Sequence, residues 1–430
     1  MTSPEGAPVR RDPDNRMILA TGVAHLLNHA FLLLYPQFLV LLQREFGLGL
    51  FALGKIANLH YLAAGLGAVP AGWIADRFGP VVTIRVFLAG SSLCLLLVAL
   101  APGPLSLTVA LTAVGAFCSL YHPAGLALLS LSARRLGRAL GLHGVIGSVG
   151  ISITPFVAAI LAQQIGWRAC CVLFAVPGLV AAVKFPALPA LGRGERPASA
   201  EPARRMSLDA ETALVGGASW SGGSTAAPTP MRWRPLLFLY LAVTLTGFVY
   251  KGTITFLPAR FASSDGPASL GAAGALTSLA LLVGMLGQYG GGLMSQRLAP
   301  APLFAALIAL STPFLALVGT GTQGLAAAAA AGFALFHFAA QPVSNAYLAR
   351  WVPAHRRSLG YGVYFTLSFG AGSFAASAAG YIAEQRGLPQ VFPFLAVVSA
   401  LSIAAIVGSI AKLPASSACA ASPDRRNSSA

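Results

Sequence analysis

Long apolar stretches alternate with short polar turns along almost the whole chain. Each stretch holds about 20 or more mainly apolar residues, the length that an α-helix needs to cross a bilayer. The pattern therefore predicts an all-α polytopic membrane protein with twelve membrane-spanning helices in two groups of six. The expected spans are 17–43, 53–78, 81–102, 104–131, 139–164 and 167–189, followed by 235–261, 269–294, 300–320, 323–350, 358–382 and 389–412.

Three polar segments divide this pattern. The stretch 190–234 is rich in Ala, Gly, Ser, Pro and Arg and lacks an apolar period, which is typical of a flexible linker. Residues 1–16 and 413–430 are predicted to be tails. No small-residue cleavage site follows the first apolar run, so we expect that run to be an uncleaved first helix. The two halves are then 17–189 and 235–412.

The halves share short sequence words, which indicates an internal duplication. The words recur in matching spans at a nearly constant offset of about half the chain. The pairs are Gly72 to Arg77 with Gly292 to Arg297, Pro123 with Pro342, and Arg138 to Gly141 with Arg357 to Gly360. Three matches in the same order predict two six-helix halves related by pseudo-symmetry.

Composition supports a membrane protein, because 56% of the 430 residues are hydrophobic and only 9% are charged. The formal net charge of +16 comes from basic residues scattered in short turns. No basic stripe interleaved with aromatic residues occurs, so the charge does not indicate a nucleic-acid-binding surface. The lipid bilayer is the expected partner.

The distribution of Lys and Arg predicts the orientation, because basic residues concentrate in cytoplasmic turns. With a cytoplasmic N-terminus, all but six of the 28 Lys and Arg lie on that side. Lys251 lies within a span, and the other five are Arg44, Lys55, Arg168, Arg260 and Arg386. We therefore expect both termini and the linker to be cytoplasmic, in a bacterial inner membrane.

The turn after the second span carries a distinctive word, Gly72-Trp73-Ile74-Ala75-Asp76-Arg77-Phe78-Gly79. It resembles G-x-x-x-D-R-x-G, the loop 2–3 signature of the major facilitator superfamily. Two basic residues usually follow in that family, whereas Pro80 and Val81 stand here and the next basic residue is Arg85. The resemblance implies a secondary transporter whose two six-helix halves rock about one central site.

The resemblance also suggests a cytoplasmic gate. Gly72 permits close helix approach, Asp76 can accept hydrogen bonds from a helix N-terminus or an Arg, and Gly79 permits a tight turn. Our hypothesis is a latch that closes against the start of the eleventh span near Ser358. The expected gating residues are Gly72, Asp76, Arg77, Gly79, Arg134 and Arg138. In the second half Gln296 replaces Asp76.

Small residues favour close helix packing in two spans. The fifth span carries Gly141, Gly144, Gly147 and Gly150, and the eighth span carries a matching run from Gly284 to Gly292. Glycines three apart form a small face against which another helix can pack.

Polar residues inside a bilayer are costly and normally face a protein interior or a wet cavity. In the major facilitator superfamily, helices 1, 4, 7 and 10 line that cavity. The polar candidates on these spans are His25, Asn28 and His29 on the first, Tyr121 and His122 on the fourth, Tyr250 and Lys251 on the seventh, and His337, Gln341 and Asn345 on the tenth.

The absence of carboxylates from the predicted spans indicates the charge of the substrate. All twelve Asp and Glu lie in tails, turns or helix ends, so the spans offer no carboxylate to bind a cation. We expect an anionic or zwitterionic substrate, such as a carboxylate or phosphonate, held by Lys251. His29, Tyr121, His122, Tyr250, His337, Gln341 and Asn345 complete the predicted substrate site, and His25, His29 and His122 are candidates for carrying the coupled proton.

Other interpretations remain open for several of these residues. Lys251 lies toward the outer end of its helix, from which its amine could reach the interface. His122 could satisfy the backbone carbonyl freed by Pro123. His25 and His29 share a helix face but lack a third ligand there, so we expect no metal and no cofactor. His60 and His143 lie on the second and fifth spans and are expected to serve packing or gating.

Within the superfamily, His25-Leu26-Leu27-Asn28-His29, Tyr121-His122-Pro123 and Arg138-x-x-Gly141 resemble the fosmidomycin-resistance type of efflux transporter. This resemblance implies a proton-coupled antiporter that exports a small anionic or amphipathic compound. Two alternatives remain open: uptake of an organic anion, and a transport-dead receptor or assembly partner. No turn carries a Ser/His/Asp, paired-carboxylate or metal-ligand set, so we do not expect an enzyme. A monomer is expected.

Overall fold

A computed structural model of the chain describes residues 13–132, 136–186, 233–262, 269–352 and 357–411, and within these ranges the fold is helical with no strand. The first half comprises α1 (Pro13–Phe46), α2 (Leu50–Leu66), α3 (Ala68–Phe78), α4 (Pro80–Ala99), α5 (Pro104–Cys118), α6 (Tyr121–Ser132) and α7 (Leu136–Lys184). The second half comprises α9 (Trp233–Ala262), α10 (Leu270–Arg297), α11 (Pro300–Val318), α12 (Gln323–Trp351), α13 (Arg357–Phe365), α14 (Phe374–Arg386) and α15 (Val391–Ala411).

These helices form the twelve predicted spans, six in each half. By length and composition, nine helices in the described ranges are long and apolar enough to cross a membrane. α7 contains the fifth and sixth spans, which turn at Gly166. The expected fold class is confirmed.

Three spans are interrupted, which the apolar pattern did not predict. The second span breaks at Gly67, between α2 and α3, and the fourth breaks after Ser119, between α5 and α6. The two breaks touch, because a Cβ added at Gly67 would lie 2.2 Å from Ser119 Oγ. In the eleventh span, a π-helical turn (Thr366–Gly370) and a 3₁₀ turn (Ala371–Ser373) separate α13 from α14.

Tight turns at glycine show the pseudo-symmetry of the halves. Gly166 joins the fifth and sixth spans with φ 84°, and Gly387 joins the eleventh and twelfth with φ 87°. Side chains rarely tolerate positive φ, so both turns depend on glycine. Gly79, the second glycine of the signature word, has φ 87° for the same reason.

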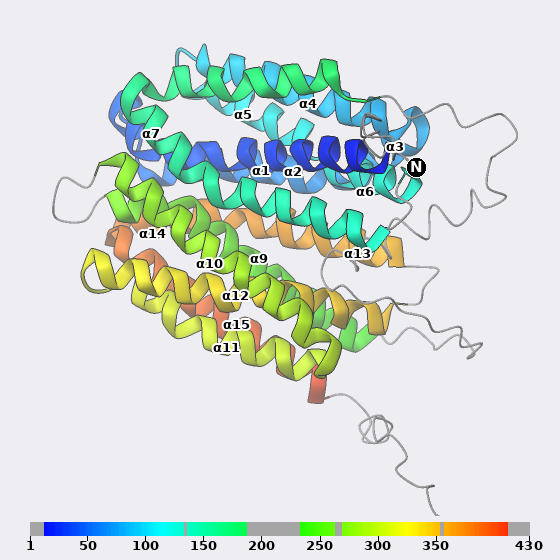
Figure 1. Cartoon of the computed structure of the whole chain (residues 1–430). Coiled ribbons are helices and arrows are strands. Elements are labelled where there is room, and N and C mark those ends of the chain that lie inside the picture. The colour runs from blue at the N-terminus through cyan, green and yellow to red at the C-terminus, as the bar shows by residue number, and fades with distance from the viewer. Residues whose placement is uncertain (1–12, 133–135, 187–232, 263–268, 353–356, 412–430) are drawn as a thin grey trace, which may run out of the picture.

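The two halves lie one above the other in Figure 1, with their helices running roughly in the same direction. We call the end that carries the N-terminal residues of α1 and the turn at Gly79 the proximal end. The opposite end, with the turns at Gly47 and Gly166, is the distal end. One hydrophobic core runs through the first half and into the second, and another lies within the second half.

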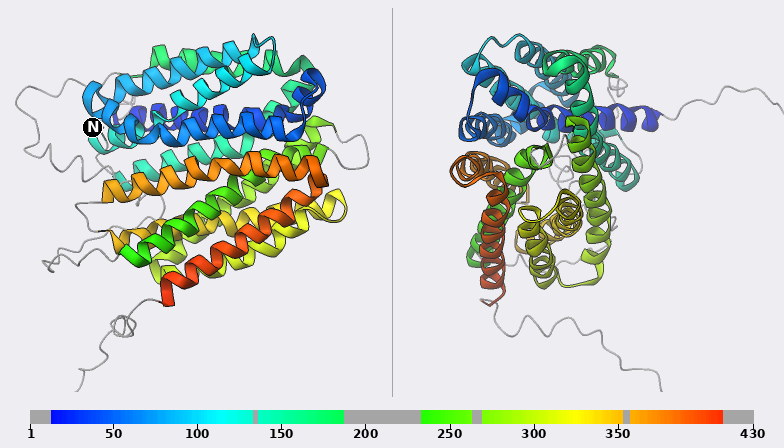
Figure 2. Two further views of the ribbon diagram at one scale, coloured as in Figure 1. Left: turned by 180° about the vertical axis from the view of Figure 1, so that it is seen from behind. Right: turned by 90° about the vertical axis from the view of Figure 1, so that its left-hand side faces the viewer.

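The most extensive contacts between the halves are those of α2 with α14 and of α7 with α10. Figure 2 shows the first pair from behind, where orange α14 lies along blue α2. Toward the distal end, Phe51 N donates to Glu384 Oε2 at 2.9 Å and Gly271 N donates to Gln163 Oε1 at 2.8 Å. The halves are therefore held together at the distal end.

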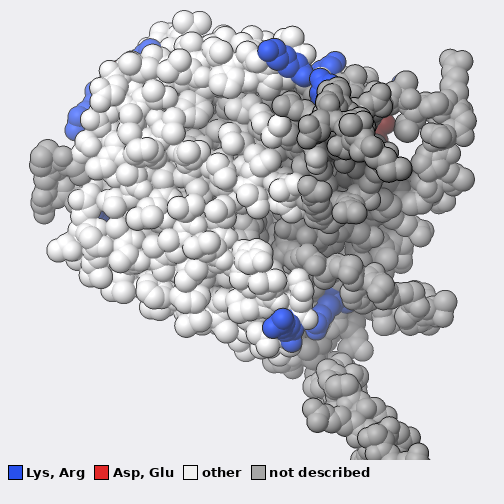
Figure 3. Space-filling model, viewed as in Figure 1, with Lys and Arg blue, Asp and Glu red and all other residues white. Residues whose placement is uncertain are grey.

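The surface matches a membrane-embedded body. In the view of Figure 3, Lys and Arg lie toward the ends of the helices, and the broad face between them is uncharged. Large apolar side chains such as Val145, Leu286 and Val397 are exposed along the helices. Lipid is the solvent that accommodates such a surface.

The predicted tails 1–16 and 413–430 and the linker 190–234 lie outside the described residues, apart from the first residues of α1 and α9. Their boundaries and the orientation of the chain remain predictions.

Candidate functional site

Histidines gather in the interior of the first half. His25 and His29 lie one helical turn apart on α1, and their Nε2 atoms are 3.0 Å apart. The first turn of α6 adds His122, whose ring centroid lies 5.2 Å from that of His25 and 5.6 Å from that of His29. The break before α6 positions this turn, because it starts a new helix at Tyr121.

α7 supplies a fourth ring. His143 stacks on His25 with 4.3 Å between ring centroids, and the His143 carbonyl accepts a hydrogen bond from His25 Nδ1 at 3.2 Å. Gly147, one turn later, makes room for this contact, because a Cβ there would lie 2.2 Å from His25 Nδ1. The sequence interpretation left His143 outside the site, although its spacing of four from Gly147 places it on the glycine face of the fifth span.

Tyr121 and Asn28 tie the cluster to its helices. Tyr121 Oη donates to the Thr21 carbonyl at 2.6 Å and lies 3.4 Å from His143 Nε2. Asn28 Nδ2 lies 3.3 Å from His122 Nε2, so His122 contacts a side chain of α1. Asn28 is fully buried, and its Oδ1 has no hydrogen-bond partner among the described residues.

Lys251 lies between the two halves. Its Nζ is 4.2 Å from the ring centroid of Tyr61 on α2, 5.1 Å from that of Phe369 in the π-helical turn and 5.6 Å from that of Tyr250. The residue is only 7% exposed, so its amine points inward among these rings and not to the membrane interface. Cation–π contacts of this kind stabilise a buried ammonium group.

No carboxylate in the described part of the chain lies within ion-pair distance of Lys251. The ion pair found among the described residues joins Arg168 to Glu45, at the distal end and away from Lys251. Tyr61 and Phe369 were not predicted as site residues, because the family resemblance directs attention to other spans. The π-helical turn that presents Phe369 left no recognised signal in the sequence.

Tyr250 and His337 meet within the second half. Their rings are nearly parallel, with centroids 6.3 Å apart. Phe333 also stacks on His337, with 4.8 Å between ring centroids. His337 is buried, and its Nδ1 has no partner among the described groups.

Gln341 and Asn345 are not brought to Lys251 by any contact that the structure describes. Gln341 is exposed and accepts a hydrogen bond from Gln288 Nε2 at 3.2 Å. Asn345 is buried, and its carbonyl accepts from Tyr361 Oη at 3.0 Å. Their predicted contact with substrate remains a prediction.

Four of the predicted gating residues, Gly72, Asp76, Arg77 and Gly79, lie at the proximal end. Asp76 and Arg77 are exposed on the last turn of α3, and α3 contacts α13, where the eleventh span begins. Arg134 lies outside the described residues, and the structure describes Arg138 only as part of the backbone of α7. The latch itself remains a prediction.

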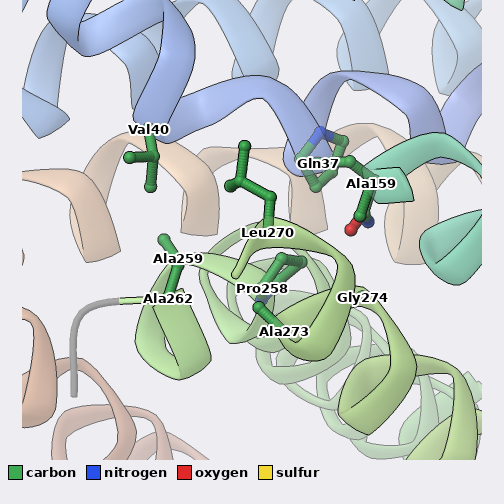
Figure 4. Close-up of a pocket in the computed structure, with 10 residues that line it drawn as sticks. Gln37, Val40, Ala159, Pro258, Ala259, Ala262, Leu270, Ala273 and Gly274 are labelled. Atoms are coloured by element: carbon green, nitrogen blue, oxygen red, sulfur yellow. The ribbon is translucent and has the colours of Figure 1, made fainter. Parts of the chain in front are cut away.

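A small crevice lies between the halves near the distal end (Figure 4). Gln37 and Val40 of α1, Ala159 of α7, and residues of α9 and α10 line it, and the lining is mostly apolar. It contains none of the predicted substrate-binding residues.

Two six-helix halves with buried polar groups within and between them define a membrane transport protein. The Major Facilitator Superfamily sequence profile matches residues 17–340 and 239–423, and the chain belongs to this superfamily. It is therefore a transporter and not an enzyme.

Two curated proteins are similar to this chain in sequence. A gallate transporter from Pseudomonas putida is 27% identical over 407 residues, which cover 88% of each chain. A puromycin resistance protein from Streptomyces alboniger is 28% identical over 150 residues, 34% of this chain and 30% of that protein.

Solved structures show the same fold. A bacterial homolog of the human lysosomal transporter Spinster, in an inward-facing and occupied conformation, matches with a TM-score of 0.75 at 15% identity, covering 95% of this chain and 98% of that one. A nucleoside transporter matches with a TM-score of 0.71 at 12% identity, covering 93% and 100%.

Proposed function

We propose that this protein is a proton-coupled secondary transporter of small organic anions, with Lys251 as the group that binds the negative charge. The halves alternate between two openings about this residue. The distal contacts between α2 and α14 and between α7 and α10 support a state that opens at the proximal end, which the positive-inside rule makes cytoplasmic.

The observation that carries the proposal is the position of Lys251. Burying an ammonium group is costly unless it is compensated, and no carboxylate in the described spans compensates it. Aromatic rings stabilise the amine but leave its charge unneutralised. A bound carboxylate would supply the missing negative charge. It would lie beside Tyr61 and Phe369, which belong to opposite halves.

The histidine cluster is the proposed proton carrier. His25, His29 and His122 adjoin one another, and in this proposal the positive charge of Lys251 disfavours a proton on them. An anion bound at Lys251 would offset that repulsion and favour a proton on the cluster. Substrate and proton would then be coupled through charge, without direct contact.

The relatives bear on both the direction of transport and the substrate. Export fits the resistance proteins, whose matches cover about a third of this chain. The gallate transporter, whose match covers most of both chains, supports an organic anion as the substrate. Gallate is an aromatic carboxylate, a substrate type that suits an amine surrounded by Tyr61, Tyr250 and Phe369. Export is our first choice and uptake the second.

Proteoliposome flux assays test the proposal. We would measure gradient-driven movement of aromatic carboxylates, phosphonates and organic cations for the wild type, Lys251→Gln and Lys184→Gln. Lys184 is an exposed lysine at the end of α7, which makes it a matched control. Anion flux should fall at least about tenfold in Lys251→Gln, because its charge interaction with the anion is lost, and should be unchanged in the control.

Flux that ignores Lys251, or that occurs only with cations, would contradict the anion site. Flux of anions that does not respond to a pH gradient would contradict only the proton coupling. The sign of the gradient that drives accumulation distinguishes export from uptake.

A further inference from the structure

The fold completes a set of ligands that the sequence left incomplete. His25 and His29 share one face of α1, and α6 brings His122 beside them. One ring nitrogen from each of these residues lies within 4.8 Å of the other two. We call His25, His29 and His122 the three-histidine cluster.

We propose that the three-histidine cluster binds a divalent transition-metal cation of the Zn²⁺ class. Neutral imidazole is a preferred ligand for such ions, and three histidines with one open position is an established coordination for zinc. Zn–N bonds of about 2.0–2.1 Å in a tetrahedron place ligand nitrogens roughly 3.4 Å apart. The 3.0 Å between the His25 and His29 nitrogens is close to that value, and a small ring rotation would bring His122 in.

Neighbouring groups hold two of the rings in place. His25 Nδ1 donates to the His143 carbonyl, which leaves Nε2 as the ligand atom facing His29. Asn28 contacts His122, and its buried, unpartnered Oδ1 offers an acceptor for a ring N–H or for a water on the metal. Metal-binding histidines in proteins are commonly oriented by such second contacts.

The charge environment limits the affinity and provides a test. In the proposed function the positive charge of Lys251 disfavours a proton on the cluster, and it would repel a metal cation there in the same way. Removing its charge should therefore strengthen metal binding. If the cluster merely packs, Lys251 has no such effect.

All three ligands belong to the first half, on α1 and α6. A rocking motion that moves the halves as rigid bodies leaves their spacing unchanged. Metal binding therefore does not require transport and can be measured on the resting protein.

Calorimetric titration of the full-length, tag-free protein in detergent with Zn²⁺ tests the site, with Co²⁺ absorption reporting the ligand geometry. We expect one ion per chain and a tetrahedral Co²⁺ spectrum. His29→Gln and His122→Gln should each weaken binding more than about 100-fold, since loss of even an orienting contact costs about 10–100-fold. Lys251→Gln should strengthen it several-fold.

His337→Gln is the control, because His337 packs on Phe333 in the second half, outside the cluster. Its Zn²⁺ affinity should equal that of the wild type, and thermal stability in detergent verifies that each variant is folded. Absence of binding in the wild type would overturn the proposal. So would equal affinity in folded His29→Gln, or equal loss in His337→Gln.

A bound cation would occupy the nitrogens that carry the proton, so Zn²⁺ should inhibit gradient-driven flux in the wild type. This expectation rests on the proposed function, whereas the binding measurement does not. Zn²⁺ that binds without inhibiting would contradict proton carriage by the cluster while leaving the metal site in place.

Discussion

The contact between Gly147 and His25 shows how one missing side chain shapes the histidine cluster. A Cβ at this position would lie 2.2 Å from His25 Nδ1, closer than two such atoms can approach. Alanine normally favours a helix over glycine by up to about 1 kcal/mol. Here the forced movement of His25 should outweigh that gain.

We predict that Gly147→Ala destabilises the protein by about 1–3 kcal/mol, the usual cost of overpacking. Thermal unfolding in detergent measures the change. Gly141→Ala on the same helix is the control, because an added Cβ there meets nothing within 4 Å, and it should be neutral or slightly stabilising. A stable Gly147→Ala with normal transport would mean that the His25 ring moves freely.

Asp76 could serve the fold or the transport cycle, and its surroundings favour the transport cycle. It is exposed at the end of α3, and no ion pair involving it occurs among the described residues. The proposed latch would form at the proximal end when that end closes. Asp76 should then matter to the transport cycle more than to the fold.

Helix interruptions set the position of several site residues. The adjoining breaks at Gly67 and Ser119 start α6 at Tyr121, which places His122 beside α1. The π-helical turn of the eleventh span places Phe369 beside Lys251. π-Helical turns inside α-helices occur frequently at functional sites.

For the α3 latch we predict that Asp76→Asn lowers transport at least about tenfold, because the amide cannot form the charged latch. Substrate affinity and thermal stability should stay near those of the wild type. Flux, equilibrium binding and unfolding measured on the same preparation check this. An equal loss of all three would show that Asp76 is only structural.

The whole molecule is held in one state by contacts at its distal end. α7 and α10 approach closely there, because a Cβ added at Gly274 would lie 2.5 Å from Ala159 Cβ. Alternating access requires these helices to separate at that end. A covalent link between them should therefore stop the cycle.

We predict that Ala159→Cys with Gly274→Cys forms a disulfide after a small adjustment, since disulfide-linked Cβ atoms lie about 3.5–4.5 Å apart. Flux should be lost on oxidation and return on reduction. The single variants are controls, and Cys94, Cys118, Cys170 and Cys171 are buried. Full flux in the cross-linked protein would show that the halves do not separate here.

The sequence by itself determined the number of spans, the duplication and the superfamily. These features depend on local apolar length and on short words such as Gly72 to Gly79, which need no knowledge of distant contacts. It also identified Lys251 and the histidines of the first and fourth spans as candidates, because polar groups within a bilayer are costly and few.

Only the tertiary structure decided how those candidates are grouped. His143 joins the cluster through the gap at Gly147, and Tyr61 and Phe369 surround Lys251 from opposite halves. Gln341, by contrast, lies apart from them. Hydropathy reports how apolar a helix is, but the direction in which each polar side chain points depends on helix rotation, breaks and neighbours far away in the chain.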